Sequence, residues 1–331
     1  MRLFNFSVVL GLSSLLFLAA CRATVPTTGE PMRIGIYNYP GYGPLYVAEE
    51  KGFFEKEGVK VELVLQPDED LLVSSFASGQ SDMIGTTADQ TVVMAAAGIP
   101  AVQVAAFDIG YCSDGILVKS DVQSIADLKG KTVYLSRGNP SHFLLRYFTK
   151  QAGLASSDVT ISNMTADQVG AAFIAGKLDY GVSWEPWLSK AKERKDGKLL
   201  KCSSDAEGII IDTLDVRRDV LERRRADVTR VVRALIGAIA FAKSNPAEAN
   251  AIMAKRFEIP VEEYNELMKT VKLHGARENV SRFDATTKLS VQEVNKLAEE
   301  IFTEDGVLEN KVDLNSLVDD RLPKEAALSL Q

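Results

Sequence analysis

Three tyrosines alternate with small residues in one short segment, Tyr37-Asn38-Tyr39-Pro40-Gly41-Tyr42-Gly43. A tyrosine ring offers a flat apolar wall with a polar tip, and glycine lets the backbone approach a bound molecule closely. A packed turn with exposed tyrosines is the alternative interpretation. We expect Tyr37, Tyr39 and Tyr42 to contact a small ligand.

Acidic residues stand at comparable places in three further loops. Asp89 follows Thr86 and Thr87, and it also fits an N-terminal cap or a first-turn acid of a helix. Asp114 precedes Gly115 in the segment that starts at Asp108, where an ordinary turn is the alternative. Trp184 and Glu185 belong to the segment SWEPW at 183–187, which also fits a structural strand-to-helix turn. We expect Asp89, Asp114, Trp184 and Glu185 to face the ligand.

One further loop, in contrast to these acidic loops, has features that suit an anion. Ser136-Arg137-Gly138-Asn139-Pro140-Ser141-His142 leads into a predicted helix, and a glycine-containing loop at a helix N-terminus suits a carboxylate, sulfonate or nitrate. We include Gly138, Asn139 and His142 among the ligand-binding candidates. For His142, orientation of the helix start is an equal alternative.

The balance of charges in these loops indicates the ligand class. Asp89, Asp108, Asp114 and Glu185 stand against Arg137 and His142. A carboxylate taken out of water is unfavourable unless a cation or several N–H donors compensate it, and tyrosine and tryptophan faces attract cations. The loops therefore favour an amine, amidine, guanidinium or aminopyrimidine-like ligand. The Gly138 loop favours the alternative, an anion such as a sulfonate or nitrate.

Alternating strands and helices must position these loops. We predict strands at 32–37, 59–65, 83–86, 101–107, 132–136, 159–163 and 180–184. We predict helices at 45–56, 71–78, 88–97, 141–152 and 166–175, and a largely helical region from about residue 226. This order predicts an α/β fold with a largely parallel sheet. Ligands bind outside the carboxyl ends of the strands in such folds, where the candidate loops lie.

The chain divides into two α/β units. The segments 77–83 and 174–180 share a glycine and an aspartate at the same offset of 97 residues, which fits two similar units. The chain enters the second unit near Ile116–Lys119 and returns through Gly208–Leu214. The predicted division is a signal peptide at 1–20, a lipidated tether at 21–31, lobe 1 at 32–115 plus 208–331, and lobe 2 at 116–207.

Composition excludes several classes of protein. The 331 residues carry a formal net charge of −7, so nucleic acid is not an expected partner. The basic segment KAKERKDGK at 190–198 is interpreted as a solvated helix face. The chain has three cysteines and two histidines, so a zinc or iron–sulfur site, or another metal cofactor, is not expected.

The amino terminus has the composition of an export signal. Arg2 is followed by an uncharged run of 14 residues, Ser7 to Ala20, which is too short to span a bilayer. Leu18-Ala19-Ala20-Cys21 resembles the bacterial lipobox, in which the leader is cut before the cysteine and lipid is attached to its sulfur. We expect Cys21 to be lipidated, palmitate included, and the body to face the periplasm or the cell exterior. A plain secretory leader or an N-terminal anchor helix is the alternative.

Export permits a disulfide between the two remaining cysteines, Cys112 and Cys202. We favour the other interpretation, that both are small, unpaired, buried hydrophobic residues.

Three segments together resemble one family. PGYGPLYVAEEKGFFEKEGVKVELV (40–64), SIADLKGKTVYLSRGNPSHFLLRYF (124–148) and AAFIAGKLDYGVSWEPW (171–187) are similar to the substrate-binding proteins of ABC importers for aliphatic sulfonates, taurine, nitrate and pyrimidine precursors of thiamine. The resemblance implies the type II periplasmic-binding clamshell, with two α/β lobes, a two-segment hinge and a ligand between the lobes. It further implies a monomer that captures its ligand by closure and delivers it to a membrane permease driven by a separate ATPase.

Two other functions stay open. An enzyme of the same fold is one, since pyrimidine-synthesising proteins resemble this branch, but the cysteine-rich metal motif expected of such enzymes is absent from the sequence. A ligand-sensing protein without a transport role is the other. We predict a binding protein and not an enzyme.

Overall fold

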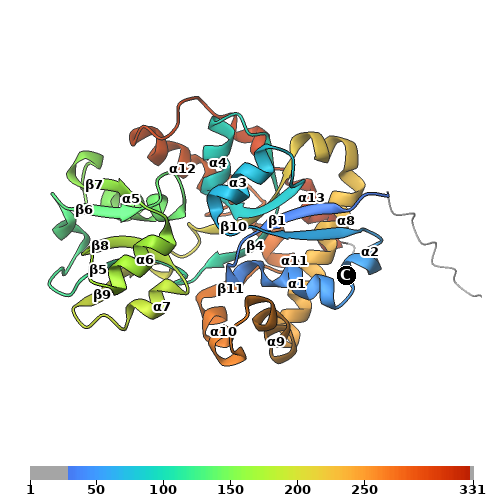
Figure 1. Cartoon of the computed structure of the whole chain (residues 1–331). Helices are drawn as coiled ribbons and strands as arrows, with labels where there is room; N and C mark the ends of the chain where they lie inside the picture. The colour runs from blue at the N-terminus through green and yellow to red at the C-terminus, as the bar shows by residue number, and fades with distance from the viewer. Residues whose placement is uncertain (1–28, 329–331) are drawn as a thin grey trace, which may run out of the picture.

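The computed structural model describes residues 29–328 as two β-sheets surrounded by helices (Figure 1). The predicted leader and Cys21 lie outside these residues. The two sheets form the two lobes of a clamshell, and helices cover both. This confirms the predicted fold class.

The first sheet has six strands in the order β11-β4-β10-β3-β1-β2. They are β1 (Met32–Ile36), β2 (Val61–Leu65), β3 (Met83–Thr87), β4 (Ala101–Gly110), β10 (Ile211–Arg217) and β11 (Val271–Leu273). β1 runs parallel to β2 and β3, whereas β10 is antiparallel to β3 and β4. β11 is antiparallel to β4 and forms an edge of the sheet.

The second sheet has five strands in the order β7-β6-β8-β5-β9. They are β5 (Asp114–Lys119), β6 (Thr132–Leu135), β7 (Thr160–Asn163), β8 (Tyr180–Trp184) and β9 (Gly197–Cys202). β6 is parallel to β7 and β8, and β5 is antiparallel to β8 and β9. Both sheets are therefore mixed and not largely parallel as predicted, because the chain leaves the first sheet along β4 and returns to it along β10.

Helices connect most of the strands. The α-helices are α1 (Gly43–Glu50), α2 (Phe53–Glu57), α3 (Glu69–Ala77), α4 (Ala88–Ala96), α5 (Pro140–Gln151), α6 (Ala166–Ile174), α7 (Trp187–Ala191), α8 (Arg218–Ser244), α9 (Pro246–Phe257), α10 (Val261–Leu267), α11 (Ala276–Arg282), α12 (Val291–Glu304) and α13 (Arg321–Leu328). The 3-10 helices are η1 (Pro40–Tyr42), η2 (Ile125–Leu128), η3 (Ser156–Asp158), η4 (Ser203–Ala206), η5 (Met268–Thr270) and η6 (Leu314–Leu317).

Three local predictions were wrong. The helix predicted at 45–56 is two helices, because Gly52 adopts a left-handed conformation (φ 69°) that interrupts the α-helix. The segment 190–198 is not one helix face, since α7 ends at Ala191 and β9 begins at Gly197. The long C-terminal helix starts at Arg218 and contains non-helical dihedral angles at Arg224.

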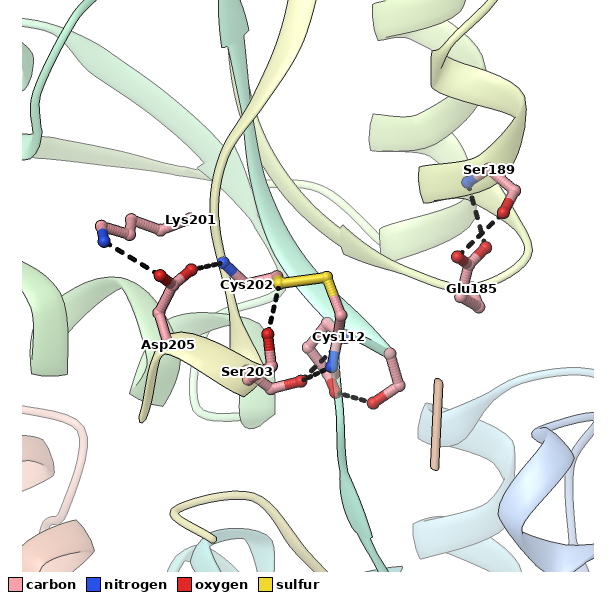
Figure 2. The surroundings of a disulfide bond; sticks show 10 residues. Cys112, Glu185, Ser189, Lys201, Cys202, Ser203 and Asp205 are labelled. Carbon is pink, nitrogen blue, oxygen red and sulfur yellow. Dashed lines mark hydrogen bonds and ion pairs between the residues drawn. A yellow bond between two sulfur atoms is a disulfide. The ribbon is translucent and has the colours of Figure 1, made fainter. Parts of the chain in front are cut away.

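Two segments connect the lobes, one between β4 and β5 and the other between β9 and β10. They contact each other directly, since the Gly110 N–H donates to the Ile210 carbonyl (3.2 Å) and the Cys112 N–H donates to Ser203 Oγ (3.0 Å). Cys112 and Cys202 form a disulfide bond between the two crossings (Figure 2). The preference for unpaired cysteines was therefore wrong.

Helix α12 packs against both lobes. Phe302 of α12, Phe143 of α5 and Val92 of α4 belong to one buried apolar cluster. α4 follows a strand of the first sheet and α5 a strand of the second, so the C-terminal segment contacts helices of both sheets (Figure 1). The exact residue limits of the two lobes stay a prediction.

Every helix in residues 29–328 is too short or too polar to cross a membrane.

Candidate binding site

A cavity of about 280 Å³ lies between residues of the two sheets. Tyr37 and Glu69 line it from the first sheet and its helices, and Ser136, Trp184 and Trp187 line it from the second. The Tyr37 and Trp184 rings face each other across the lobes, with centroids 6.1 Å apart. A volume near the lower end of the range for small-molecule sites limits the ligand to a compact molecule.

The charged residues that line this cavity are all acidic. They are Asp68, Glu69, Asp70 and Asp167. Asp68 accepts a hydrogen bond from the Leu71 N–H (2.8 Å) as the cap of α3, and Asp167 accepts one from Trp187 Nε1 (2.6 Å). No lysine, arginine or histidine is among the lining residues.

Glu69 makes a hydrogen bond between the lobes. It accepts from Asn139 Nδ2 (2.9 Å), whose own Oδ1 accepts from the Ser141 N–H and caps α5. Burial raises the pKa of Glu69 to about 8, although the Asn139 bond acts in the opposite direction. This hydrogen bond exists only when the lobes are together.

The tyrosine loop packs as a cluster of rings behind the cavity. Tyr42 stands edge-on to Tyr37 and Tyr39, with ring centroids 5.4 and 5.2 Å apart. All three rings are at least nine-tenths buried, and burial raises the pKa of each hydroxyl well above its usual value. The alternative of exposed tyrosines on a turn does not match this packing.

Two carboxyl groups lie side by side against these rings. Asp108 of β4 and Asp212 of β10 are opposite each other in the ladder, and both are buried. Tyr39 Oη donates to Asp108 Oδ1 (3.4 Å) and Tyr42 Oη donates to Asp212 Oδ1 (2.9 Å). Oδ2 of each aspartate has no hydrogen-bond partner within residues 29–328. Burial, and then the neighbouring carboxyls, raise the pKa of both groups well above the usual range.

Gly41 is required for this packing. A Cβ at this position would lie 1.9 Å from Asp108 Oδ2, so only glycine permits the carboxyl group to approach the loop so closely.

Two of the predicted acids, Asp114 and Asp89, are also buried carboxyl groups with raised pKa values. Asp114 accepts a hydrogen bond from Ser113 Oγ (2.6 Å), and burial raises its pKa to about 6. Asp89 stands in the first turn of α4, and neither of its carboxyl oxygens has a hydrogen-bond partner in the described part of the chain. Burial raises the pKa of Asp89 to about 7. We call Asp89, Asp108, Asp114 and Asp212 the inner carboxyls.

The remaining predicted residues have partners within the protein. His142 is fully buried, its Nδ1 accepts from the Gly138 N–H (3.1 Å), and its Nε2 bonds Asp305 (2.7 Å) beyond α12. These contacts fit the alternative, orientation of the start of α5, and ligand contact by His142 stays a prediction. Gly138 has a φ of 81°, and a Cβ there would face Val307 and Val93 rather than the cavity.

Glu185 caps the helix that follows it. Its two oxygens accept from the Ser189 N–H (3.0 Å) and Ser189 Oγ (2.9 Å), as Figure 2 shows. It lines a different groove, next to Cys112, and not the cavity of Tyr37 and Trp184. The geometry matches the alternative of a structural strand-to-helix turn.

Sequence reasoning missed Glu69 and Asp212. Glu69 lies in the acidic run Asp68-Glu69-Asp70, in which Asp68 caps α3, and nothing in the run itself distinguishes Glu69 as a cavity residue. Asp212 follows three isoleucines, and a charged residue inside such an apolar strand was the signal that was available.

Comparison with known proteins assigns the family. The family model described as NMT1/THI5 like matches residues 39–249, which include both crossings and most of both sheets. The chain belongs to the NMT1/THI5-like family.

Relatives of this NMT1/THI5-like protein include binding proteins. A protein of Escherichia coli (strain K12) named for the binding of aliphatic sulfonates is 28% identical over 258 residues, covering 76% of this chain and 80% of the relative.

Solved structures share the fold of the NMT1/THI5-like chain. The periplasmic aliphatic sulphonate binding protein from Escherichia coli matches with a TM-score of 0.72 at 23% identity, over 88% of this chain and 92% of that one. The periplasmic nitrate-binding protein from Synechocystis PCC 6803 also matches with a TM-score of 0.72, at 16% identity, over 93% and 89%. At these identities the likeness establishes the clamshell fold and leaves the ligand open.

Proposed function

We propose that this protein is the solute-binding component of an ABC importer and that its ligand is a small organic cation, such as an amine, amidine, guanidinium or aminopyrimidine. The observation that carries the ligand class is the lining of the cavity, in which four acidic residues and no basic residue face a space between two lobes. A clamshell with a polar cavity between its lobes captures a solute and releases it on opening.

The arrangement favours a cation electrostatically. Glu69 lines the cavity, and the negative charges of inner carboxyls help to raise the pKa of Glu69, Asp89 and Asp212. Each carboxyl is unfavourable in its ionised form while buried without a counter-charge. A positively charged ligand in the cavity compensates Glu69 directly, since Glu69 lines the space, and compensates the buried inner carboxyls through space.

The aromatic residues add to this preference. Tyr37 and Trp184 form facing walls from opposite lobes, and Trp187 borders the same space. A cation over such rings gains roughly 0.5–2 kcal/mol. Because the two rings belong to different lobes, a cationic ligand in the cavity that contacts both of them stabilises the closed form.

The second candidate is an anionic ligand. The names of relatives, which refer to aliphatic sulfonates, favour it. In this cavity an anion would require protonated carboxyls or contacts from the backbone of the loops, so the residues that line the space favour the cation.

Catalysis is the least supported role. The two histidines of the chain do not line the cavity between the lobes, and His142 uses both ring nitrogens within the protein. A sensor without a transport role would use the same closure and is distinguished by its partner, a receptor in place of a permease and an ATPase.

Intrinsic fluorescence tests the ligand class. Both tryptophans of the chain, Trp184 and Trp187, line the cavity, so the emission reports on this site. We expect benzamidine or a 4-aminopyrimidine to change the emission with saturation, and taurine and nitrate to leave it unchanged. Saturation with taurine or nitrate, with no response to either cation, would overturn the proposed ligand class and support the second candidate.

A further inference from the structure

A second pocket of about 590 Å³ lies on the first lobe, beside the edge strand β11. Its walls come from β4, β11, α11 and the end of α8, and the second crossing contributes Glu207. It shares no lining residue with the cavity between the lobes. A ligand can therefore occupy it independently of that cavity.

One side of this pocket is apolar. Ile109, Ala242 and Val271 line it and are themselves at most 6% exposed, and Met268 and Leu273 extend the same wall. A hydrocarbon portion of a ligand would replace water against this wall, which is favourable.

A buried histidine with a free nitrogen stands in the lining. His274 is 4% exposed, and its Nδ1 has no hydrogen-bond partner in residues 29–328. Its backbone is fixed, because its N–H donates to the Phe107 carbonyl (2.8 Å) and its carbonyl accepts from Asn279 Nδ2 (2.8 Å). An unpartnered buried polar atom is unfavourable and marks a place where a ligand can supply the missing bond.

The charges of the lining leave one cation in excess. Lys272 pairs with Glu207 (2.6 Å), and Lys243 lies 3.6 Å from Glu278. Arg282 has no acidic partner at ion-pair distance in the described chain, and its Nη1 donates to the Leu289 carbonyl (2.7 Å). Burial and the neighbouring Arg282 lower the pKa of His274 to about 3, so the imidazole is neutral and leaves Arg282 as the surplus charge.

We propose that this pocket is a second binding site, which takes a small monocarboxylate with an apolar tail. The carboxylate bonds the Arg282 guanidinium and a ring nitrogen of His274, and the tail lies against Ile109, Ala242 and Val271. The planar guanidinium matches a carboxylate in shape. A single surplus positive charge balances a monoanion, whereas a divalent phosphate would leave a negative charge uncompensated.

The two histidines make nuclear magnetic resonance of the imidazoles a direct test with the full chain. Hexanoate is the probe, and the His274→Gln variant assigns the signals. We expect hexanoate to shift the His274 resonances with saturation, to leave those of His142 in place, and to leave tryptophan emission unchanged. Hexanamide, which has the same tail without the charge, is expected to bind at least about tenfold more weakly.

Two variants and a control locate the contact. Arg282→Gln is expected to weaken hexanoate binding about tenfold or more, and Lys243→Gln, which keeps the Arg282 contact, by a smaller factor. Arg277→Gln removes an exposed arginine of the same helix and is expected to bind like the wild type. Absence of a His274 shift, equal affinity for hexanamide, tighter binding of inorganic phosphate, or full affinity in the Arg282→Gln variant would overturn the proposal.

Discussion

Glu69 is the carboxyl group that combines the two properties on which the proposed function depends. It lines the cavity with a half-buried carboxyl, and it accepts the Asn139 hydrogen bond from the other lobe. Substitution to glutamine separates these properties, because the amide carbonyl still accepts from Asn139 while the charge is lost.

The first prediction concerns this substitution. Glu69→Gln is expected to weaken the binding of benzamidine at pH 8.5 about tenfold, the usual cost of losing a charged partner of a buried ligand. Fluorescence titration measures the change. Glu62→Gln, which removes an exposed acid on β2, is the matched control, and an equal loss in both variants would contradict the role of Glu69.

The second prediction concerns stability and pH in the absence of ligand. The pKa values of Asp89, Asp215 and Glu69 are raised to about 7, 7 and 8, so the folded state binds more protons than the unfolded state. The free energy of unfolding must then fall as the pH rises through this range. We expect these three groups to lower the free energy of unfolding by about 3–4 kcal/mol between pH 6.5 and 8.5, measured by urea unfolding.

The window limits the contribution of the histidines. The pKa values of His142 and His274 are lowered by burial, so their opposite effect is mostly complete by pH 6.5 and adds less than about 1 kcal/mol above it. Glu69→Gln is expected to show a smaller decrease than the wild type. A protein that is more stable at pH 8.5 than at pH 6.5 would contradict the burial of these carboxyls.

At the scale of elements, the two crossings act as one unit. The Cys112–Cys202 disulfide connects them, and Ser203 accepts a hydrogen bond from the Cys112 N–H (Figure 2). Because the bond joins residues 90 positions apart, it encloses nearly the whole second lobe in a covalent loop.

The third prediction follows from that loop. Replacement of both cysteines by serine is expected to lower the free energy of unfolding by about 4 kcal/mol, because a long closed loop restricts the unfolded chain. Urea unfolding measures the difference. Cys21→Ser serves as the control and is expected to unfold like the wild type, and equal stability of all three proteins would show that the cross-link contributes nothing.

The sequence allowed most of the elements and the lobes to be predicted, because hydrophobic periodicity and glycine positions are local. Gly79 and Gly176 end their helices with φ of 79° and 69°. Tyr37 and Trp184 both line the cavity between the lobes, and their contact with a ligand stays a prediction. The predictions failed where residues far apart in sequence pair with each other, because no local pattern specifies such pairs. Three pairings are of this kind: the disulfide, the adjacent Asp108 and Asp212, and the hydrogen bond between His142 and Asp305.

At the scale of the whole molecule, the proposed function requires a position outside the cytoplasm. The predicted leader and Cys21 lie outside residues 29–328, so the lipid anchor rests on the sequence motif alone. An anchored clamshell stays near its permease, while the cavity between the lobes exchanges ligand with the surroundings.

The fourth prediction concerns this anchor. Cys21→Ser is expected to move the protein from the membrane fraction to the soluble extracytoplasmic fraction and to abolish labelling by radioactive palmitate. Ligand binding is expected to be unchanged, because the residues that line the cavity all lie between positions 37 and 187. Retention of most of the variant in the membrane fraction would contradict lipid anchoring.

The sign of proton exchange on binding tests the central claim most directly. The pKa of Glu69, which lines the cavity, is raised to about 8, and that of the neighbouring buried Asp89 to about 7, so both are at least half protonated at pH 7. A bound cation displaces these protons and a bound anion retains them or takes up more. A pH-indicator titration in unbuffered saline at pH 7 counts the protons exchanged. We expect benzamidine to bind with release of protons to the solution; binding of taurine with proton uptake, and none of benzamidine, would contradict the account.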